Sequence, residues 1–72
     1  MYIVINNTKN KQYQFTGGWP SGIIEYMLDN GDDIIVISTY SNTIKVPIGF
    51  GIKFEGEWEW KEYNYSLFMF KE

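Results

Sequence analysis

The most regular pattern of hydrophobic and polar positions lies between residues 50 and 70, in the stretch FGIKFEGEWEWKEYNYSLFMF. More than half of the chain's aromatic residues fall in this stretch. In its first half, aromatic side chains have even numbers and carboxylates have odd numbers: Phe54, Trp58 and Trp60 against Glu55, Glu57 and Glu59. Because successive side chains of a strand point to opposite faces, this alternation predicts a strand with one apolar and one solvated face. We expect the rest of the chain to pack against it.

The alternation changes parity after Trp60, where the apolar positions become odd-numbered (Tyr63, Tyr65, Leu67 and Met69). A strand that keeps both halves on one core must re-aim its side chains, so we predict a bulge near Lys61 and Glu62. A turn at Lys61 and Glu62 is the alternative, but neither residue suits a tight primed turn. Glu55-Gly56 could itself form a hairpin turn, which would pair residues 52–54 with residues 58–60.

The first part of the chain predicts a β-hairpin. Residues 2–5 are apolar without alternation, which is typical of a central strand with both faces buried. Tyr13 and Phe15 alternate with glutamines, which predicts a second strand. The polar residues 6–11 between the two segments indicate a loop longer than a tight two-residue turn.

A short helix is predicted over about residues 20–30. Pro20 and Ser21 favour a first helical turn, and Asn30-Gly31 is typical of a helix end, since glycine adopts the left-handed conformation at low cost. Between them, four apolar side chains recur at helical spacing: Ile23, Ile24, Met27 and Leu28. A helix this short is stable only when such a stripe packs on a sheet.

Two more strands are predicted before the aromatic stretch. Residues 34–38 (IIVIS) form a continuous apolar, mostly β-branched run, which is typical of a buried strand. Ile44, Val46 and Ile48 alternate with Lys45 and Pro47. Because proline cannot donate a backbone hydrogen bond, Pro47 predicts an edge strand, or at least a side of that strand without a partner.

These elements predict a single domain over residues 1–72 with an α+β fold. The expected order is β-hairpin, helix and β-meander, with one short helix packed on a mainly antiparallel sheet of four to six strands. A grasp-like mixed sheet fits the same order of elements and is the alternative.

The composition lacks the residue types that most catalytic mechanisms use. The chain has neither cysteine nor histidine, so it lacks disulfides, the usual zinc ligands, and the side chains most used as nucleophile and base. We therefore expect a protein that is not an enzyme and has no catalytic residues, metal site or cofactor. Residues 29–33 (DNGDD) place oxygen ligands around a glycine, but they lack the spacing and the closing glutamate of a calcium loop.

Six lysines, nine carboxylates and no arginine give a net charge of −3. This balance disfavours a surface for phosphate groups, which needs clustered cations. The chain starts without a cationic signal-peptide lead, and no apolar run is long enough to span a membrane, so we expect a cytoplasmic protein that does not bind membranes. Abundant Ile, Asn, Lys and Tyr are typical of A+T-rich coding, which suggests a low-G+C bacterium or its phage.

Protein binding is the function we expect first. One helix covers one face of a sheet, so an aromatic face or edge remains for a partner protein, or for self-association as a homodimer or larger oligomer. The acidic residues nearby favour a basic partner surface. With the suggested origin, an inhibitor or modulator of a host protein is the concrete form of this hypothesis. The candidate aromatic patch consists of Phe54, Trp58, Trp60, Tyr63 and Tyr65.

A small-ligand site is the second hypothesis. Rings and carboxylates would line a pocket or its rim, above all between subunits of an oligomer, and a planar ligand such as a nucleotide base would stack there. The candidates are Trp19, Tyr26, Tyr40, Glu55, Glu57 and Glu59. Two weaker alternatives are a single-stranded nucleic-acid platform with Lys53 and Lys61, and an acidic mimic of nucleic acid. The glutamates repel phosphate, and the charge density is low for a mimic.

Overall fold

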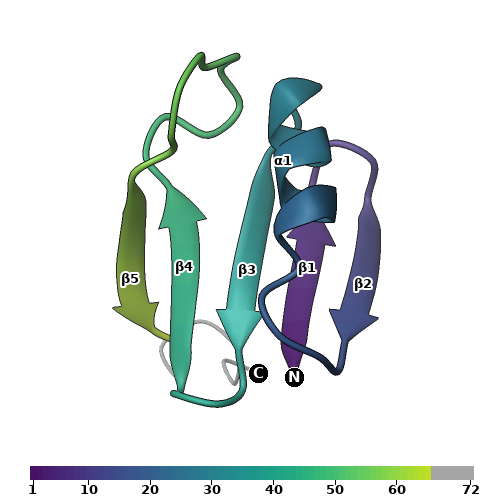
Figure 1. The fold of residues 1–72 in the computed structure, drawn as a ribbon, viewed down its shortest axis with the longest axis vertical. Coiled ribbons are helices and arrows are strands. Elements are labelled where there is room, and N and C mark those ends of the chain that lie inside the picture. Colours follow the sequence, from purple (N-terminus) through teal and green to yellow (C-terminus); the bar gives the residue numbers. More distant parts are fainter. Residues whose placement is uncertain (66–72) are drawn as a thin grey trace.

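The computed structural model describes residues 1–65, and residues 66–72 lie outside the described part. The strands form one five-stranded sheet in the order β2-β1-β3-β4-β5 (Figure 1). All neighbouring strands in it are antiparallel, which confirms the α+β fold with hairpin, helix and meander and excludes the grasp-like mixed sheet for the described residues. The elements are β1 (Tyr2–Asn6), β2 (Lys11–Phe15), α1 (Ser21–Asp29), β3 (Ile34–Ser38), β4 (Thr43–Pro47) and β5 (Trp60–Asn64).

The antiparallel register divides the side chains of the sheet between two faces. Val4 lies opposite Val36 of β3 and Tyr13 of β2, and all three pack in the core with α1. The residues between them in sequence point away from α1, because side chains alternate along a strand. We call this second side the open face; its apolar members are Ile3, Ile5, Ile35, Ile37, Ile44, Val46 and Tyr63. The same registers also place Gln12, Gln14 and Lys61 on this side.

The main core lies between α1 and the two strands β1 and β3. Its buried members are Val4, Ile24, Met27, Leu28, Ile34 and Val36. Full burial of one such aliphatic side chain contributes about 1.5–3 kcal/mol. This packing stabilises a nine-residue helix that would be marginal in isolation.

The helix ends agree with the sequence, although the start is not capped as expected. Pro20 occupies the N-cap position, and no side chain caps the helix, so Ser21 is simply its first residue. At the other end Asn30 is the C-cap, and Gly31 has a φ of 79° and donates its N–H to the Leu28 carbonyl at 2.9 Å. Glycine adopts this conformation without steric cost, which explains why the helix ends there.

The strand predicted from the alternation of Phe54, Trp58 and Trp60 is wrong for most of its length. Residues 48–59 form an irregular segment, and β5 begins only at Trp60. This segment contains three glycines with positive φ, at residues 49, 51 and 56. The sheet ladder resumes where the N–H of Ile48 bonds to the Glu59 carbonyl. Alternation alone does not make a strand, because the backbone also needs a partner for its hydrogen bonds.

The predicted bulge and the predicted hairpin turn are also absent from the described residues. β5 pairs with β4 through five consecutive residue pairs, from Pro47 opposite Trp60 to Thr43 opposite Asn64. Lys61 lies within this unbroken ladder, so no bulge re-aims the side chains, and residues 58–60 do not pair with residues 52–54. As a consequence, Trp60 and Tyr63 point to opposite faces of the sheet.

The edge position predicted for β4 is wrong, because β4 lies between β3 and β5. Pro47 is tolerated there for a geometric reason. The N–H of Ile48 points to β5, so the nitrogen of Pro47 points to the β3 side, where the pairing with β3 has already ended at Lys45. The second form of the prediction, a side of the strand without a partner, is the one that fits.

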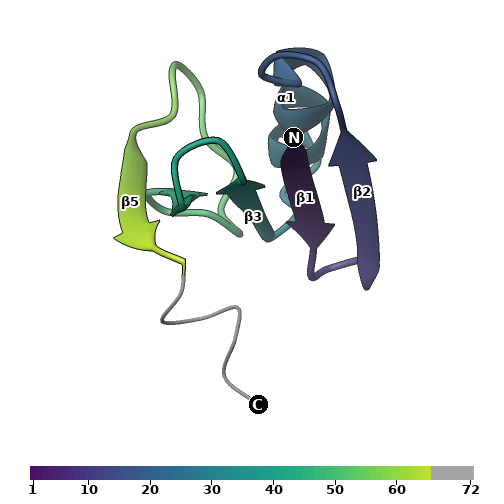
Figure 2. The ribbon, with the colours of Figure 1, turned by 90° about the horizontal axis from the view of Figure 1, so that it is seen from below.

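The helix lies on one side of the sheet, over β1 and its neighbours rather than over β4 and β5 (Figures 1 and 2). No helix of the described residues covers the open face. Among these residues, no helix is long and apolar enough to cross a membrane.

Candidate functional site

The three tryptophans of the chain line a single cleft on the α1 side of the sheet. The cleft lies between α1 and the end of the irregular segment, and it has a volume of about 570 Å³. We call it the tryptophan cleft. Its lining residues are Trp19, Ser21, Ile24, Glu25, Leu28, Asp29, Gly56, Glu57, Trp58 and Trp60.

Aromatic contacts hold the rings of the cleft in place. The rings of Trp19 and Trp60 meet edge to face, with centroids 5.3 Å apart and planes at 88°. Tyr2 contacts Trp19 in the same way at 5.4 Å, and Phe54 packs on Trp58 at 4.6 Å. Such pairs contribute about 0.5–1.5 kcal/mol beyond their buried area, so the half-buried indoles are ordered by their neighbours.

One cation already uses an indole of this cleft. The Nζ of Lys45, on β4, lies 5.1 Å from the ring centroid of Trp19, which is within cation–π range. The same Nζ lies 3.6 Å from a carboxylate oxygen of Glu62 on the neighbouring strand. Lys45 thus ties the sheet to Trp19, a role that the sequence pattern did not indicate.

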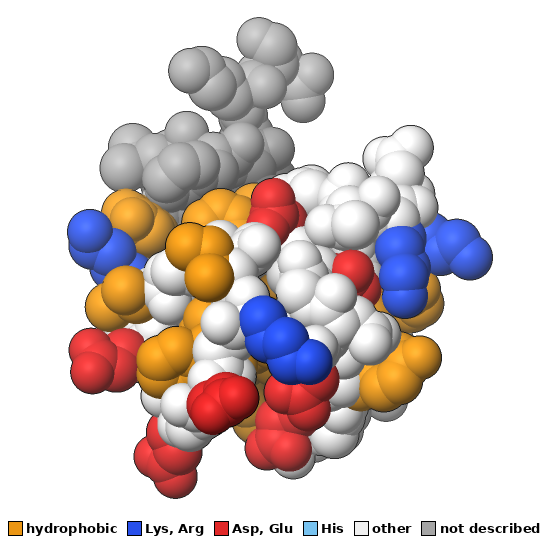
Figure 3. Space-filling view, turned by 90° about the horizontal axis from the view of Figure 1, so that it is seen from above, with side chains coloured by type: hydrophobic (Ala, Val, Ile, Leu, Met, Phe, Trp, Pro, Cys, Tyr) orange, Lys and Arg blue, Asp and Glu red, His pale blue; other side chains and the backbone are white. Residues whose placement is uncertain are grey.

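The charged lining of the tryptophan cleft is entirely acidic. Glu25 and Asp29 come from the exposed side of α1, and Glu57 comes from the irregular segment. Figure 3 shows acidic side chains gathered along the lower margin of that view, which is the side of α1, next to hydrophobic ones. No group of three or more such carboxylates in the described residues is close enough to hold a metal ion.

A second hollow, with a volume of about 490 Å³, lies on the open face. Its lining is apolar except for one tyrosine hydroxyl and consists of Ile5, Ile35, Ile37, Ile44, Val46, Phe50 and Tyr63. Beside it Ile48 continues the alternation of β4 and is 53 % exposed. Sequence analysis identified residues 34–38 as a buried strand, and this is confirmed, since every residue of β3 except the half-buried Ile35 is buried. It did not identify Ile35 as part of a hollow.

The structure divides the predicted aromatic patch between two sides of the sheet. Phe54, Trp58 and Trp60 belong to the tryptophan cleft or its support, whereas Tyr63 lines the hollow of the open face. Tyr65 follows β5 and donates its N–H to the Asn42 carbonyl at 3.4 Å.

The predicted pocket residues are likewise only partly brought together. Trp19 and Glu57 line the tryptophan cleft, but Glu55 and Glu59 are exposed and are not part of its lining. Tyr26 is 60 % exposed on α1, where Lys9 lies over its ring at 5.9 Å from the centroid. Tyr40 contacts the Tyr2 ring at 5.3 Å and donates a hydrogen bond to the Thr16 carbonyl at 3.2 Å.

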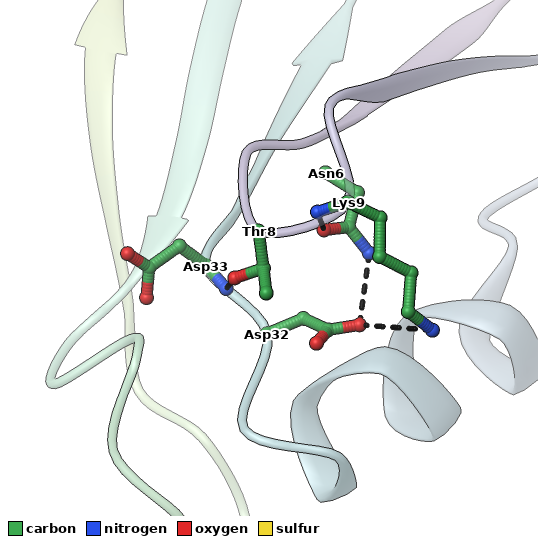
Figure 4. A network of polar contacts seen from close by, with 5 residues as sticks. All are labelled: Asn6, Thr8, Lys9, Asp32 and Asp33. Carbon is green, nitrogen blue, oxygen red and sulfur yellow. Dashed lines mark hydrogen bonds and ion pairs between the residues drawn. The ribbon is translucent and has the colours of Figure 1, made fainter.

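A buried polar network lies outside both hollows and has a structural role (Figure 4). The carboxylate of Asp32 accepts a hydrogen bond from the side-chain amide of Asn6 at 2.9 Å and lies 3.5 Å from the Nζ of Lys9. Asn6 in turn accepts a hydrogen bond from the Lys9 backbone N–H. The turn after α1 is therefore tied to the β1–β2 turn.

Comparisons with models of protein families, with curated proteins and with solved structures found no match for this chain. The function of the chain is therefore inferred from the two hollows and from the residues around them.

Proposed function

We propose that this chain is a non-enzymatic binding protein that docks through the open face of its sheet, and that the occupant is a second copy of the chain. The observation that carries the proposal is that the sheet has apolar side chains on both faces, while the described helix covers only one. On this side Ile37 and Ile44 are buried and Ile3, Ile5, Ile35 and Val46 are half-buried, whereas Ile48 and Tyr63 are exposed. Apolar surface that remains exposed in this way marks interaction sites in soluble proteins.

The open face resembles one half of a β-sandwich interior. Five strands of about five residues give a surface of about 20 Å by 17 Å, from the usual strand spacing and rise. Two such faces, extended by Ile48 and Phe50, would bury several hundred Å² on each copy, which is typical of the smaller specific interfaces. Sheets pack in this way with their inner side chains interdigitating.

The shape and charge of the open face favour a second copy over an unrelated partner. Ile48 protrudes beside an apolar hollow, so a two-fold arrangement can place Ile48 of each copy in the hollow of the other. Alternation places Lys61 of β5 on this side of the sheet, and Glu59, just before β5, has the opposite sign. They can therefore pair at the rim of a symmetric contact without net repulsion.

Sedimentation equilibrium of the full chain tests this proposal. We expect a reversible dimer, and we expect Ile48→Asp to weaken it at least tenfold, because a carboxylate would be buried against aliphatic side chains. The matched control is Tyr26→Asp, which removes an equally exposed apolar side chain on the α1 side and should leave the dimer unchanged. A chain that is monomeric at every concentration would overturn the proposal and leave the segment 66–72 as the alternative occupant of this face.

The cytoplasmic location and the small non-enzymatic character expected from the sequence are part of this proposal. The lack of histidine and cysteine supports the non-enzymatic character, because these side chains are the usual base and nucleophile.

A further inference from the structure

We infer that the tryptophan cleft is a binding site for an organic ammonium cation, such as a lysine side chain or a free amine. The cleft lies on the α1 side of the sheet, opposite the open face, so this inference does not depend on the proposed self-association. It concerns a ligand, whereas the open face concerns an oligomer.

The size and composition of the cleft suit a small organic ligand. Its volume of about 570 Å³ falls in the range of small-molecule sites, which is about 300–1,000 Å³. All three tryptophans of the chain are half-buried and contribute their indoles to the wall of the cleft. Trp is the side chain whose ring face attracts cations most strongly.

The charged side chains that line the cleft are all negative. Glu25, Asp29 and Glu57 line it, and no lysine belongs to the lining. Carboxylates at the rim of a cleft attract cations during encounter and repel anions. The cleft is therefore poorly suited to a nucleotide, whose phosphates would meet these three side chains.

A cation of the chain itself already lies over one indole of the cleft. The Lys45 ammonium lies 5.1 Å from the Trp19 centroid, while Glu62 balances its charge. Because Lys45 is a side chain of β4 and does not line the cleft, the wall formed by Trp58 and Trp60 is left for an external cation.

The choice of an organic cation over a metal ion follows from the carboxylates. Calcium needs about six to eight oxygen ligands at short range, and the described residues hold no cluster of acidic side chains able to bind a metal. An ammonium group on an alkyl chain needs only aromatic rings and a diffuse negative field, and the lining of this cleft contains three indoles and three carboxylates.

The experiment is a titration of the full chain with choline, followed by tryptophan fluorescence and by the NMR signals of the indole N–H groups. Since all three tryptophans line the cleft, the fluorescence reports on it directly. The probe without charge is dimethylbutanol, in which a carbon atom replaces the nitrogen of choline. We expect choline to shift the indole signals and to bind about tenfold more tightly than dimethylbutanol.

The variants separate the cleft from its surroundings. Glu57→Gln should weaken choline binding several-fold and reduce its dependence on salt, because one screened attraction is lost. Glu55→Gln is the matched control, since it removes the same charge two positions earlier in a side chain that does not line the cleft. Both side chains are exposed, so both variants should fold. A Trp58→Leu variant, which keeps an apolar wall but removes the ring, should lose most of the preference for choline.

Two further probes distinguish the sources of the cation. Butylamine stands for a free amine, and N-acetyl-lysinamide stands for the lysine of a peptide; binding by either supports the inference, and the tighter one identifies the source. Three results would overturn it: no probe shifts the indole signals, dimethylbutanol binds as well as choline, or Glu55→Gln and Glu57→Gln have equal effects.

Discussion

Asp32 is a carboxylate that is only 4 % exposed, next to Asn6, which is fully buried. Burial of a charge is costly unless hydrogen bonds and an opposite charge compensate it. The Asn6 amide and the Lys9 ammonium supply both, and together they connect β1, the β1–β2 turn and the turn between α1 and β3. Among the polar residues of the described chain, those of this network are the ones whose substitution we expect to lower the free energy of unfolding most.

We expect Asn6→Ala to lower the free energy of unfolding by about 2–3 kcal/mol, because it leaves a buried carboxylate without its amide donor. The measurement is urea denaturation followed by circular dichroism. Thr8→Ala is the comparison in the same turn, since it removes only the exposed acceptor of the Asp33 N–H and should cost about 0.5–1 kcal/mol. If the two variants lowered the free energy of unfolding equally, the buried hydrogen bond between Asn6 and Asp32 would have no special role in stability.

At the scale of elements, the irregular segment 48–59 decides where β5 begins and how the tryptophan cleft is closed. Gly49 and Gly51 both have positive φ, at 77° and 86°. Only Gly51 also faces another element closely, because a Cβ built there would collide with the carboxylate of Asp33, just before β3. The segment thus approaches the start of β3 closely at Gly51, where a side chain would have to displace the Asp33 carboxylate.

We expect Gly51→Ala to be more destabilising than Gly49→Ala. The backbone conformation alone costs about 1–2 kcal/mol for alanine, and only Gly51→Ala adds the collision with Asp33. Urea denaturation measures the difference, and tryptophan fluorescence reports any displacement of the cleft wall.

The Asp33→Ala background is the control for this comparison. It removes the obstacle, so the extra loss at Gly51 should disappear there while the loss at Gly49 stays the same. If Gly51→Ala and Gly49→Ala cost the same in both backgrounds, the close approach to Asp33 has no energetic role.

At the scale of the whole molecule, the sheet separates two surfaces of different chemistry. The cleft on the α1 side combines indoles with carboxylates, and the hollow of the open face is lined mainly by aliphatic side chains. A domain of this length buries only about 60 % of its unfolded surface, so its stability is expected to be low when side chains such as Ile48 and Tyr63 stay exposed. Burial of the open face between two copies would add to the stability of each.

This reasoning predicts a melting temperature that depends on protein concentration. A tenfold increase in concentration favours a dimer by about 1.4 kcal/mol, or half of that for each chain, which corresponds to roughly 3–5 °C in a domain of this size. Differential scanning calorimetry over a wide concentration range would measure it. The Ile48→Asp variant should melt at one temperature throughout, and a concentration-independent melting temperature of the unaltered chain would argue against a dimer.

The sequence by itself determined the types of most elements and their order. The bounds of α1 follow from Pro20, the apolar stripe and Asn30-Gly31, and the central position of β1 and β3 follows from their unbroken apolar runs. These features are local, because they depend on backbone preferences and on side-chain spacing within a few residues.

Only the tertiary structure decided which side chains meet. The alternation around Trp58 suggested a strand, but β4 pairs with residues 60–64 instead, and that register places Trp60 and Tyr63 on opposite faces. Trp19 joins Trp58 and Trp60 in one cleft although it lies about forty residues earlier in the chain. Such contacts depend on which strand supplies the hydrogen-bond partner, and a pattern within one segment does not contain that information.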